Sequence, residues 1–210
     1  MYRPQNDTRL LCEALRETGV RGSRVLDACT GTGRVAVAAA LGGAAVVTAV
    51  DVSWRAVVST RANALLRGLD IRVRRGDLFA PVRGERFDVI TANPPYVPCG
   101  QDRGPAGRHG RARAWDAGPR GRATVDRICA QAPGLLDSGG ILLMVHSALC
   151  GVDATLAALR EAGLKASVSL RREEPFGPVM RGRAVALASG GFIRPGQEHE
   201  ELVVIRAERV

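Results

Sequence analysis

The chain has no uninterrupted apolar run long enough to cross a membrane. Its longest apolar stretch, residues 35–50, is broken by Gly42 and Gly43, and it is shorter than the roughly 20 residues that a membrane-spanning helix requires. Residues 1–7 show no charged segment followed by an apolar one, so no secretory signal is visible. We therefore expect a cytoplasmic protein with no membrane association.

Cysteine pairs with the spacing of zinc ligands are also missing. The five cysteines, Cys12, Cys29, Cys99, Cys129 and Cys150, are widely spaced and include no Cys-x-x-Cys pair. Such spacing argues against the common zinc motifs, and the odd number argues against a disulfide framework. We expect reduced thiols and no metal site.

Lysine is almost absent, because Lys165 is the only one. Arginine nevertheless gives a net charge of +9 and an isoelectric point of about 10.5, which favours an anionic partner such as nucleic acid. Arginine, alanine, glycine and valine dominate throughout, so compositional bias explains part of this excess. A local cluster of basic residues is therefore more informative than the net charge.

The main basic cluster falls in a segment without helical or strand periodicity. Residues 97–121 are rich in glycine, proline and arginine, and they include Arg103, Arg108, His109, Arg111 and Arg113. A loop of this length in a compact domain is usually functional or disordered. Its role is left open at this point.

Apolar periodicity predicts an α/β fold in one domain, residues 1–210, because 46% hydrophobic content is ample for a single core. The expected strands are residues 24–28, 46–50, 71–74, 87–92, 140–145, 166–170 and 202–205. The expected helices are residues 7–18, 35–41, 54–66, 123–132 and 152–162, with a short one at 183–188 in a proline- and glycine-rich insertion, 175–201. Strand and helix alternation predicts a mostly parallel sheet, and Asp7 is expected to cap the first helix.

The first strand runs into a glycine loop, Cys29-Thr30-Gly31-Thr32-Gly33, and then into a helix. Strand, glycine loop and helix form a nucleotide-binding unit. The spacing Gly31-x-Gly33-x-x-Ala36, with Asp51 after the second strand, fits a dinucleotide fingerprint only weakly. The distance of the glycines from Asp27 and the end of the fourth strand both argue against a dinucleotide.

The fourth strand ends at Asn93-Pro94-Pro95-Tyr96. Two prolines cannot continue a strand, so a rigid turn follows at its carboxyl end, where open α/β sheets bind ligands. Asn93 offers an amide oxygen, the prolines expose a carbonyl, and Tyr96 offers a flat face. These groups suit a planar nitrogen, either an amide or an exocyclic base amine. The alternative for the tetrapeptide alone is a structural turn.

Several motifs together carry a resemblance to a known family. They are residues 27–33, Asp51, 76–79 and 87–98, with 2–4 and 7–11 upstream and 114–118 and 121–127 downstream. The chain resembles the S-adenosylmethionine (SAM) methyltransferases, and more narrowly the short HemK-like protein glutamine methyltransferases that modify release factors. The resemblance covers the chain through about Gly163. It implies a class I methyltransferase fold, a Rossmann-like three-layer sandwich with a mostly parallel seven-stranded sheet and an antiparallel last strand.

The resemblance also implies the cofactor SAM, with S-adenosylhomocysteine as product. Its binding residues would be Thr8, Asp27, Ala28, Cys29, Thr30, Gly31, Gly33, Asp51, Val52, Asp77, Leu78 and Asn93. Backbone groups of residues 28–33 would face the methionine moiety, Asp51 would bind the ribose hydroxyls, and Asp77 would hold the adenine amine. The family's first loop glycine is Cys29 here; a positive φ at this position would strain it by about 1–2 kcal/mol.

Catalysis would belong to the tetrapeptide. Asn93 and the Pro94 carbonyl would accept the hydrogens of the target nitrogen, and Tyr96 would stack on its plane. The first hypothesis is protein glutamine N5-methylation, with a release factor as the family-typical substrate. The second is methylation of a nucleic-acid amine such as adenine N6, which the basic loop favours and the Trp115 region disfavours. Small-molecule methylation and a non-catalytic SAM-binding module complete the alternatives.

The expected third strand alternates apolar and charged residues over 71–74, as a half-exposed edge strand does. By the resemblance, some relatives use the edge at 71–75 to pair with a small zinc-binding activator protein. The arginines here could instead keep that edge solvated. We expect activity without an activator.

Overall fold

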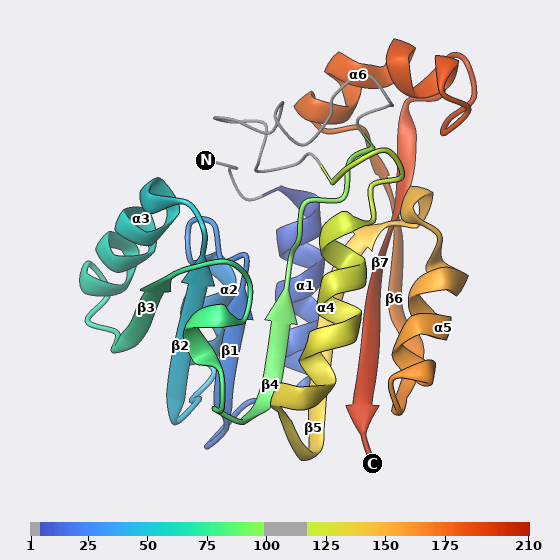
Figure 1. Cartoon of the computed structure of the whole chain (residues 1–210). Coiled ribbons are helices and arrows are strands. Elements are labelled where there is room, and N and C mark those ends of the chain that lie inside the picture. Colours follow the sequence, from blue (N-terminus) through green and yellow to red (C-terminus); the bar gives the residue numbers. More distant parts are fainter. Residues whose placement is uncertain (1–4, 99–116) are drawn as a thin grey trace.

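The computed structural model describes residues 5–98 and 117–210, so predictions that fall on residues 1–4 and 99–116 lie outside the described part. A seven-stranded sheet with the order β3-β2-β1-β4-β5-β7-β6 forms its centre (Figure 1). The strands are β1 (Arg24–Ala28), β2 (Val46–Asp51), β3 (Ile71–Arg75), β4 (Phe87–Ala92), β5 (Leu136–Ser147), β6 (Leu164–Pro175) and β7 (His199–Arg209).

The strand directions confirm the predicted sheet. β1 pairs in parallel with β2 and β4, β2 with β3, and β4 with β5. Only β7 runs antiparallel to its neighbours, β5 and β6. β3 lies at one edge, as the alternating pattern of residues 71–74 predicts.

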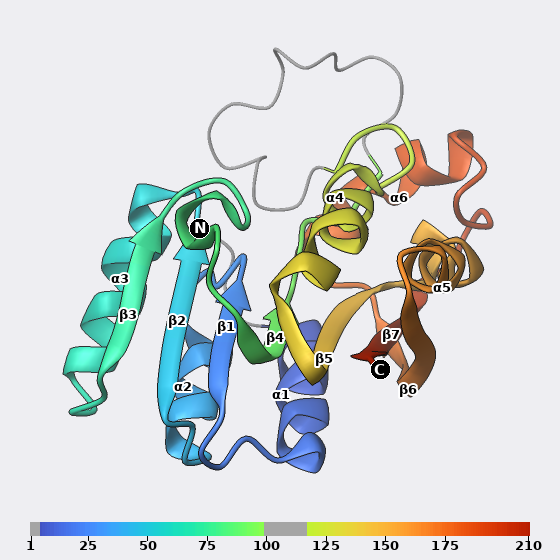
Figure 2. The same ribbon diagram turned by 60° about the horizontal axis from the view of Figure 1, so that its bottom comes forward.

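Helices cover both faces of the sheet (Figures 1 and 2). One face carries α1 (Asn6–Thr18), α2 (Arg34–Leu41) and α3 (Trp54–Leu65), and the other carries α4 (Ala123–Gln131) and α5 (Val152–Glu161). Two clusters of buried apolar residues lie between the layers, one on each face. None of the helices in residues 5–98 and 117–210 is both long and apolar enough to span a bilayer.

The carboxyl-terminal third is more regular than the sequence pattern predicts. β6 and β7 pair over eleven residues from Leu164↔Arg209 to Pro175↔His199, so each strand extends well beyond its expected apolar centre. The short helix expected at 183–188 is α6 (Pro178–Ser189), which begins with proline in its first turn. The outer part of this hairpin carries polar residues, so an apolar pattern does not reveal the full length of the two strands or of α6.

Strand order brings the predicted functional segments together. β1 and β4 are neighbours with Ala28 beside Ala92, so the glycine loop and the tetrapeptide leave the sheet side by side. α6 lies beyond this carboxyl edge in Figure 1, and its Met180 and Leu187 belong to the same buried cluster as Tyr96. A ligand at this edge is therefore bordered by the glycine loop, the tetrapeptide and the hairpin insertion.

Candidate active site

The glycine loop after β1 has a backbone that only certain residues adopt easily. Gly31 has φ +60° with open space at its Cβ position, whereas a Cβ on Gly33 (φ +80°) would lie 2.6 Å from Thr60 Cγ2. Gly33 is thus required by packing against α3. The open side of Gly31 leaves room for a ligand to approach the backbone.

Two non-glycine residues in the described part of the chain have positive φ, Cys29 at 57° and Leu78 at 47°. Each costs about 1–2 kcal/mol relative to glycine, and such strain tends to occur at functional sites. Cys29, which replaces the family's first loop glycine, therefore has the positive φ at which strain was expected. Leu78 was not expected to be strained, since nothing in a strand-end sequence distinguishes it.

Asp27, at the end of β1, holds the loop from beneath. Its carboxylate accepts hydrogen bonds from Thr30 Oγ1 (2.5 Å), the Ala36 backbone N–H (3.1 Å) and Thr91 Oγ1 (2.8 Å). The side chain is buried, which raises its pKa to about 6 even though these three bonds favour the ionised form. These three bonds tie Asp27 to the glycine loop, to α2 and to β4, so its carboxylate holds the loop against the sheet.

Asp51, at the end of β2, faces the same loop. One carboxylate oxygen accepts from the Gly31 N–H at 2.9 Å and the other from the Ser53 N–H at 2.8 Å. Val52 lies in the turn between Asp51 and Ser53. Burial raises the pKa of Asp51, and the backbone bonds oppose that shift. The carboxylate is therefore fixed beside the open face of Gly31.

Asp77, after β3, is held by a residue that the sequence did not single out. Arg127 on α4 donates from Nη1 to Oδ1 at 3.1 Å and from Nη2 to Oδ2 at 2.8 Å. Both groups act on the Cys29 thiol: its pKa is raised first by burial and then by Asp51, Asp27 and Asp77, while Arg127 lowers it. The neighbouring Gly76 N–H donates to the Asp51 carbonyl at 3.1 Å, so the turn that carries Asp77 adjoins the end of β2.

The tetrapeptide is tied to the start of α1. Asn93 Nδ2 donates to Thr8 Oγ1 at 3.2 Å, Thr8 Oγ1 donates to Asp7 Oδ1 at 3.1 Å, and Tyr96 donates its hydroxyl hydrogen to Asp7 Oδ2 at 3.2 Å. Asp7 and Thr8 are buried. The expected helix cap was wrong: Gln5 is the N-cap, and Asp7 lies in the first turn with its side chain committed to the tetrapeptide.

The amide orientation of Asn93 has a chemical consequence. Because Nδ2 is engaged by Thr8, Oδ1 points elsewhere, and it accepts no hydrogen bond from the residues that the structure describes. Asn93 is half-buried, next to the buried Pro94. The site thus presents an oriented acceptor at the carboxyl end of β4.

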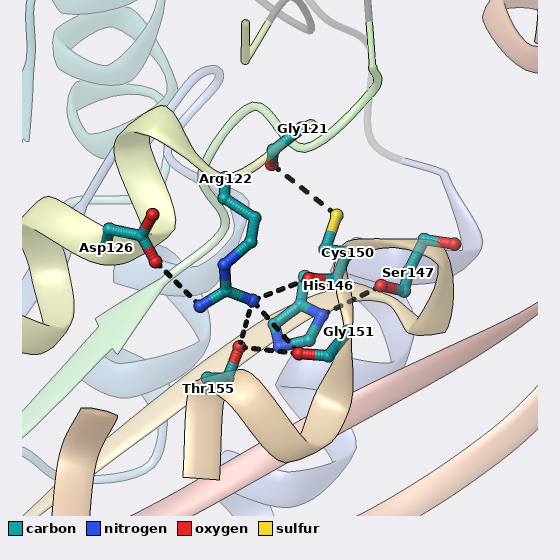
Figure 3. Close-up of polar contacts among 8 residues, drawn as sticks. All are labelled: Gly121, Arg122, Asp126, His146, Ser147, Cys150, Gly151 and Thr155. Carbon is teal, nitrogen blue, oxygen red and sulfur yellow. Dashed lines mark hydrogen bonds and ion pairs between the residues drawn. The ribbon is translucent and has the colours of Figure 1, made fainter. Parts of the chain in front are cut away.

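A second hydrogen-bond network, around Arg122 and Cys150 (Figure 3), contacts the tetrapeptide through Tyr96. Cys150 Sγ donates to the Tyr96 carbonyl at 3.0 Å, and a Cβ on Gly121 would lie 2.4 Å from the same oxygen. Arg122 donates to the Cys150 carbonyl at 2.5 Å and to Thr155 Oγ1 at 3.0 Å. The segment after residue 116 is thereby anchored against the tetrapeptide.

His146, at the end of β5, is fully buried beside this network (Figure 3). Its Nδ1 lies 2.9 Å from the Ser147 carbonyl oxygen. Burial lowers its pKa, so the ring stays neutral at physiological pH. This agrees with the structural role expected for it; His109 lies outside the described residues.

The structure therefore places the predicted site residues together at the carboxyl ends of the parallel strands. Thr8 and the tetrapeptide meet directly, and hydrogen bonds from Gly31 and Gly76 to Asp51 join the loops after β1, β2 and β3. The contacts of Asp7, Arg127 and Arg122 were not predicted from the sequence. Their positions in the matching motifs 7–11 and 121–127 were the available signal, but partners 28 to 89 residues away are not visible in a linear pattern.

Comparison with known proteins supports the same assignment. Residues 3–106 match the family described as Methyltransferase small domain. The Methanocaldococcus jannaschii protein named "Putative protein N5-glutamine methyltransferase MJ0928" is 34% identical over 180 residues, 86% of this chain and 89% of that protein. The release factor glutamine methyltransferase of Bordetella pertussis is 36% identical over 178 residues, 81% of this chain, but this chain spans only 64% of its length.

Among solved structures, a chain of the E. cuniculi Mtq2–Trm112 complex, which methylates the translation termination factor eRF1, has a TM-score of 0.69. It is 24% identical, and the match covers 100% of this chain and 98% of that one. At this identity the likeness establishes the fold, which is that of the class I methyltransferases. The chain belongs to the protein N5-glutamine methyltransferase family of SAM-dependent methyltransferases.

Proposed function

We propose that this enzyme methylates the side-chain amide nitrogen of a glutamine in a protein, with a release factor as the substrate. The observation that carries the proposal is the orientation of Asn93. Its Nδ2 is engaged by Thr8 at 3.2 Å, so Oδ1 is available to accept a hydrogen from an incoming amide. Relatives named for glutamine methylation support this choice of substrate.

The cofactor residues are proposed from the same geometry. Asp51 lies beside the open face of Gly31 and can accept from two ribose hydroxyls, while Asp77 can accept from the adenine amine. The backbone from Ala28 through Gly33 would face the methionine part, and Thr8, Val52 and Leu78 would complete the contacts. The strained, glycine-containing loop and its adjacent carboxylates fit a nucleoside with a diol and an amine.

SAM supplies an electrophilic methyl group when it is bound. An amide nitrogen is a weak nucleophile because its lone pair is delocalised, so the protein must orient it and stabilise the positive charge that develops. Asn93 Oδ1 and the Pro94 carbonyl would each accept one amide hydrogen, and the Tyr96 ring would stack on the amide plane. No general base is required before transfer, since the proton can leave the product afterwards.

Methylation of a nucleic-acid amine is the second candidate, favoured by the net charge of +9. The arginine cluster at 103–113 and Trp115 lie outside the described residues. The decisive experiment incubates the protein with SAM carrying a labelled methyl group and a cell lysate, followed by nuclease or protease. Label that resists nuclease and maps to glutamine in a release factor supports the proposal; label lost to nuclease supports the second candidate.

We also propose that the β3 edge binds a small zinc-binding partner protein. Beside this edge strand, α3 leaves Trp54 58% exposed and Val58 47% exposed, and Leu65 follows at 81%. Such an apolar group is more typical of an interface than of the arginine-protected edge that the sequence predicts. The expectation of activity without an activator stays a prediction, and activity of the isolated chain against activity after co-expression with a small zinc protein would decide it.

A further inference from the structure

The ion pair between Asp77 and Arg127 joins two elements that border the cofactor site. Asp77 follows β3 and Arg127 lies on α4, and the two planar groups meet with two parallel hydrogen bonds, 3.1 and 2.8 Å long. Paired bonds of this kind fix the angle between the guanidinium and carboxylate planes as well as their distance.

The backbone around Asp77 is fixed independently of this pair. A Cβ on Gly76 would lie 2.1 Å from Pro81 Cγ, and Leu78 is buried with φ 47°. The Asp77 side chain, in contrast, is 60% exposed. Among the described residues, Arg127 donates both hydrogen bonds that this carboxylate accepts, so the guanidinium sets its orientation.

We propose that Arg127 is a positioning residue for adenine recognition: it holds the Asp77 carboxylate in the orientation that accepts the exocyclic amine of the cofactor. Each carboxylate oxygen can accept two hydrogen bonds, so the two bonds from Arg127 leave capacity on both oxygens. The inference rests on the proposed role of Asp77 at the adenine amine. It does not depend on which substrate is methylated.

The alternative to a positioning role is that Arg127 and Asp77 form an ordinary surface ion pair. Exposed pairs contribute little to stability, and many contribute nothing measurable. The chain offers a matched control in Arg171 and Glu201, which also meet at 2.8 Å with side chains 50% and 42% exposed, against 46% and 60% for Arg127 and Asp77. That pair joins β6 to β7, at the opposite end of the strand order from β3.

The test is titration calorimetry of the full chain with S-adenosylhomocysteine. We expect R127A to weaken binding by about 3- to 10-fold and R127K by less, because lysine keeps the charge but cannot form the paired bonds. R171A should leave the affinity unchanged. An R127A protein that binds as tightly as R171A, or more tightly than the unmodified chain, overturns the proposal.

Two further arms separate positioning from general damage. S-inosylhomocysteine lacks the exocyclic amine, so R127A should weaken its binding much less than that of S-adenosylhomocysteine; equal losses would indicate a merely structural role. The double variant D77N/R127A should bind no more weakly than D77N alone. If D77N itself leaves binding unchanged, the assignment of the adenine site fails; if only R127A does, the positioning role fails.

Discussion

Two parts of the site at the carboxyl ends of the strands are held together differently. The proposed cofactor half consists of the loops after β1, β2 and β3, and the proposed substrate half consists of the tetrapeptide and the start of α1. On the proposed cofactor half, the Gly31 backbone N–H donates to the Asp51 carboxylate across 20 residues, and Arg127 donates to the Asp77 carboxylate across 50. On the substrate half, side chains bond across 85 residues between Asn93 and Thr8 and across 89 between Tyr96 and Asp7. The side-chain contacts that hold the proposed substrate half thus join more distant parts of the chain than those on the proposed cofactor half.

The sharpest test of this separation is Asn93→Ala. Asn93 would accept from the target nitrogen, so turnover should fall about 10²- to 10³-fold, as when one preorganised electrostatic partner is removed. SAM affinity should change little. Single-turnover methyl transfer and calorimetry on the same preparation measure the two effects, and Asn6→Ala, which removes an amide on α1 that bonds Glu174, is the control. Full turnover in Asn93→Ala would mean that the tetrapeptide is only a turn.

The reciprocal test is Asp51→Ala on the cofactor half. Loss of charge-assisted bonds to two hydroxyls should lower SAM affinity by about 10- to 100-fold, with turnover at saturating SAM much less affected. Asp88 provides the control, because its carboxylate also accepts a backbone N–H, from Arg24 at 2.7 Å, at the amino end of the sheet. Unchanged calorimetric affinity in Asp51→Ala would remove Asp51 from the site.

A pH experiment compares stability rather than binding. Burial raises the pKa of Glu200, near α1 on the substrate half, from 4.5 to about 7. Its stabilising contribution is full below pH 4.5 and is lost as the pH rises to about 7, because the fold disfavours the ionised form. Glu200→Gln should therefore be more stable than the unmodified protein at pH 8, by about 1–3 kcal/mol, and equal to it near pH 4.5.

Denaturant unfolding at both pH values measures this difference. The effect of the buried His146 runs in the opposite direction but is common to both proteins, so it cancels. Glu201→Gln is the matched control, because Glu201 is next to Glu200 in the sequence but its own carboxylate is exposed and pairs with Arg171. A pH-independent difference for Glu200→Gln would contradict the prediction.

The smallest expected effect concerns strain on the cofactor half. Cys29→Gly should raise the free energy of unfolding by about 0.5–1 kcal/mol, because glycine adopts positive φ without penalty but loses more entropy on folding. Leu78→Gly relieves the same kind of strain, yet it should destabilise the protein, since the buried leucine side chain is lost. Destabilisation by Cys29→Gly in denaturant titrations would show that backbone strain at this position is not the deciding term.

The same contrast explains what the sequence could predict. Alternating strand and helix patterns predicted the parallel sheet, and the place of Cys29 in the glycine loop predicted its strain, because these features are local. The cofactor roles of Asp51 and Asp77 stay predictions. The length of α6, the helix cap at Gln5 and the partners of Asp7 and Arg127 depend on packing between distant segments. The turn at the tetrapeptide was predicted from its two prolines. The hydrogen-bond networks around Asp7 and Cys150 that support it were not predicted.

The bond between Asn93 and Thr8 also bears on the order in which activity returns during folding. Closing the chain between residues 85 apart costs about 1 kcal/mol more entropy than closing one of 20, the separation of Gly31 and Asp51. Contacts of high sequence separation form slowly. A refolding chain would therefore recover cofactor binding before turnover, and methyl transfer would report the arrival of its first helix at the fourth strand.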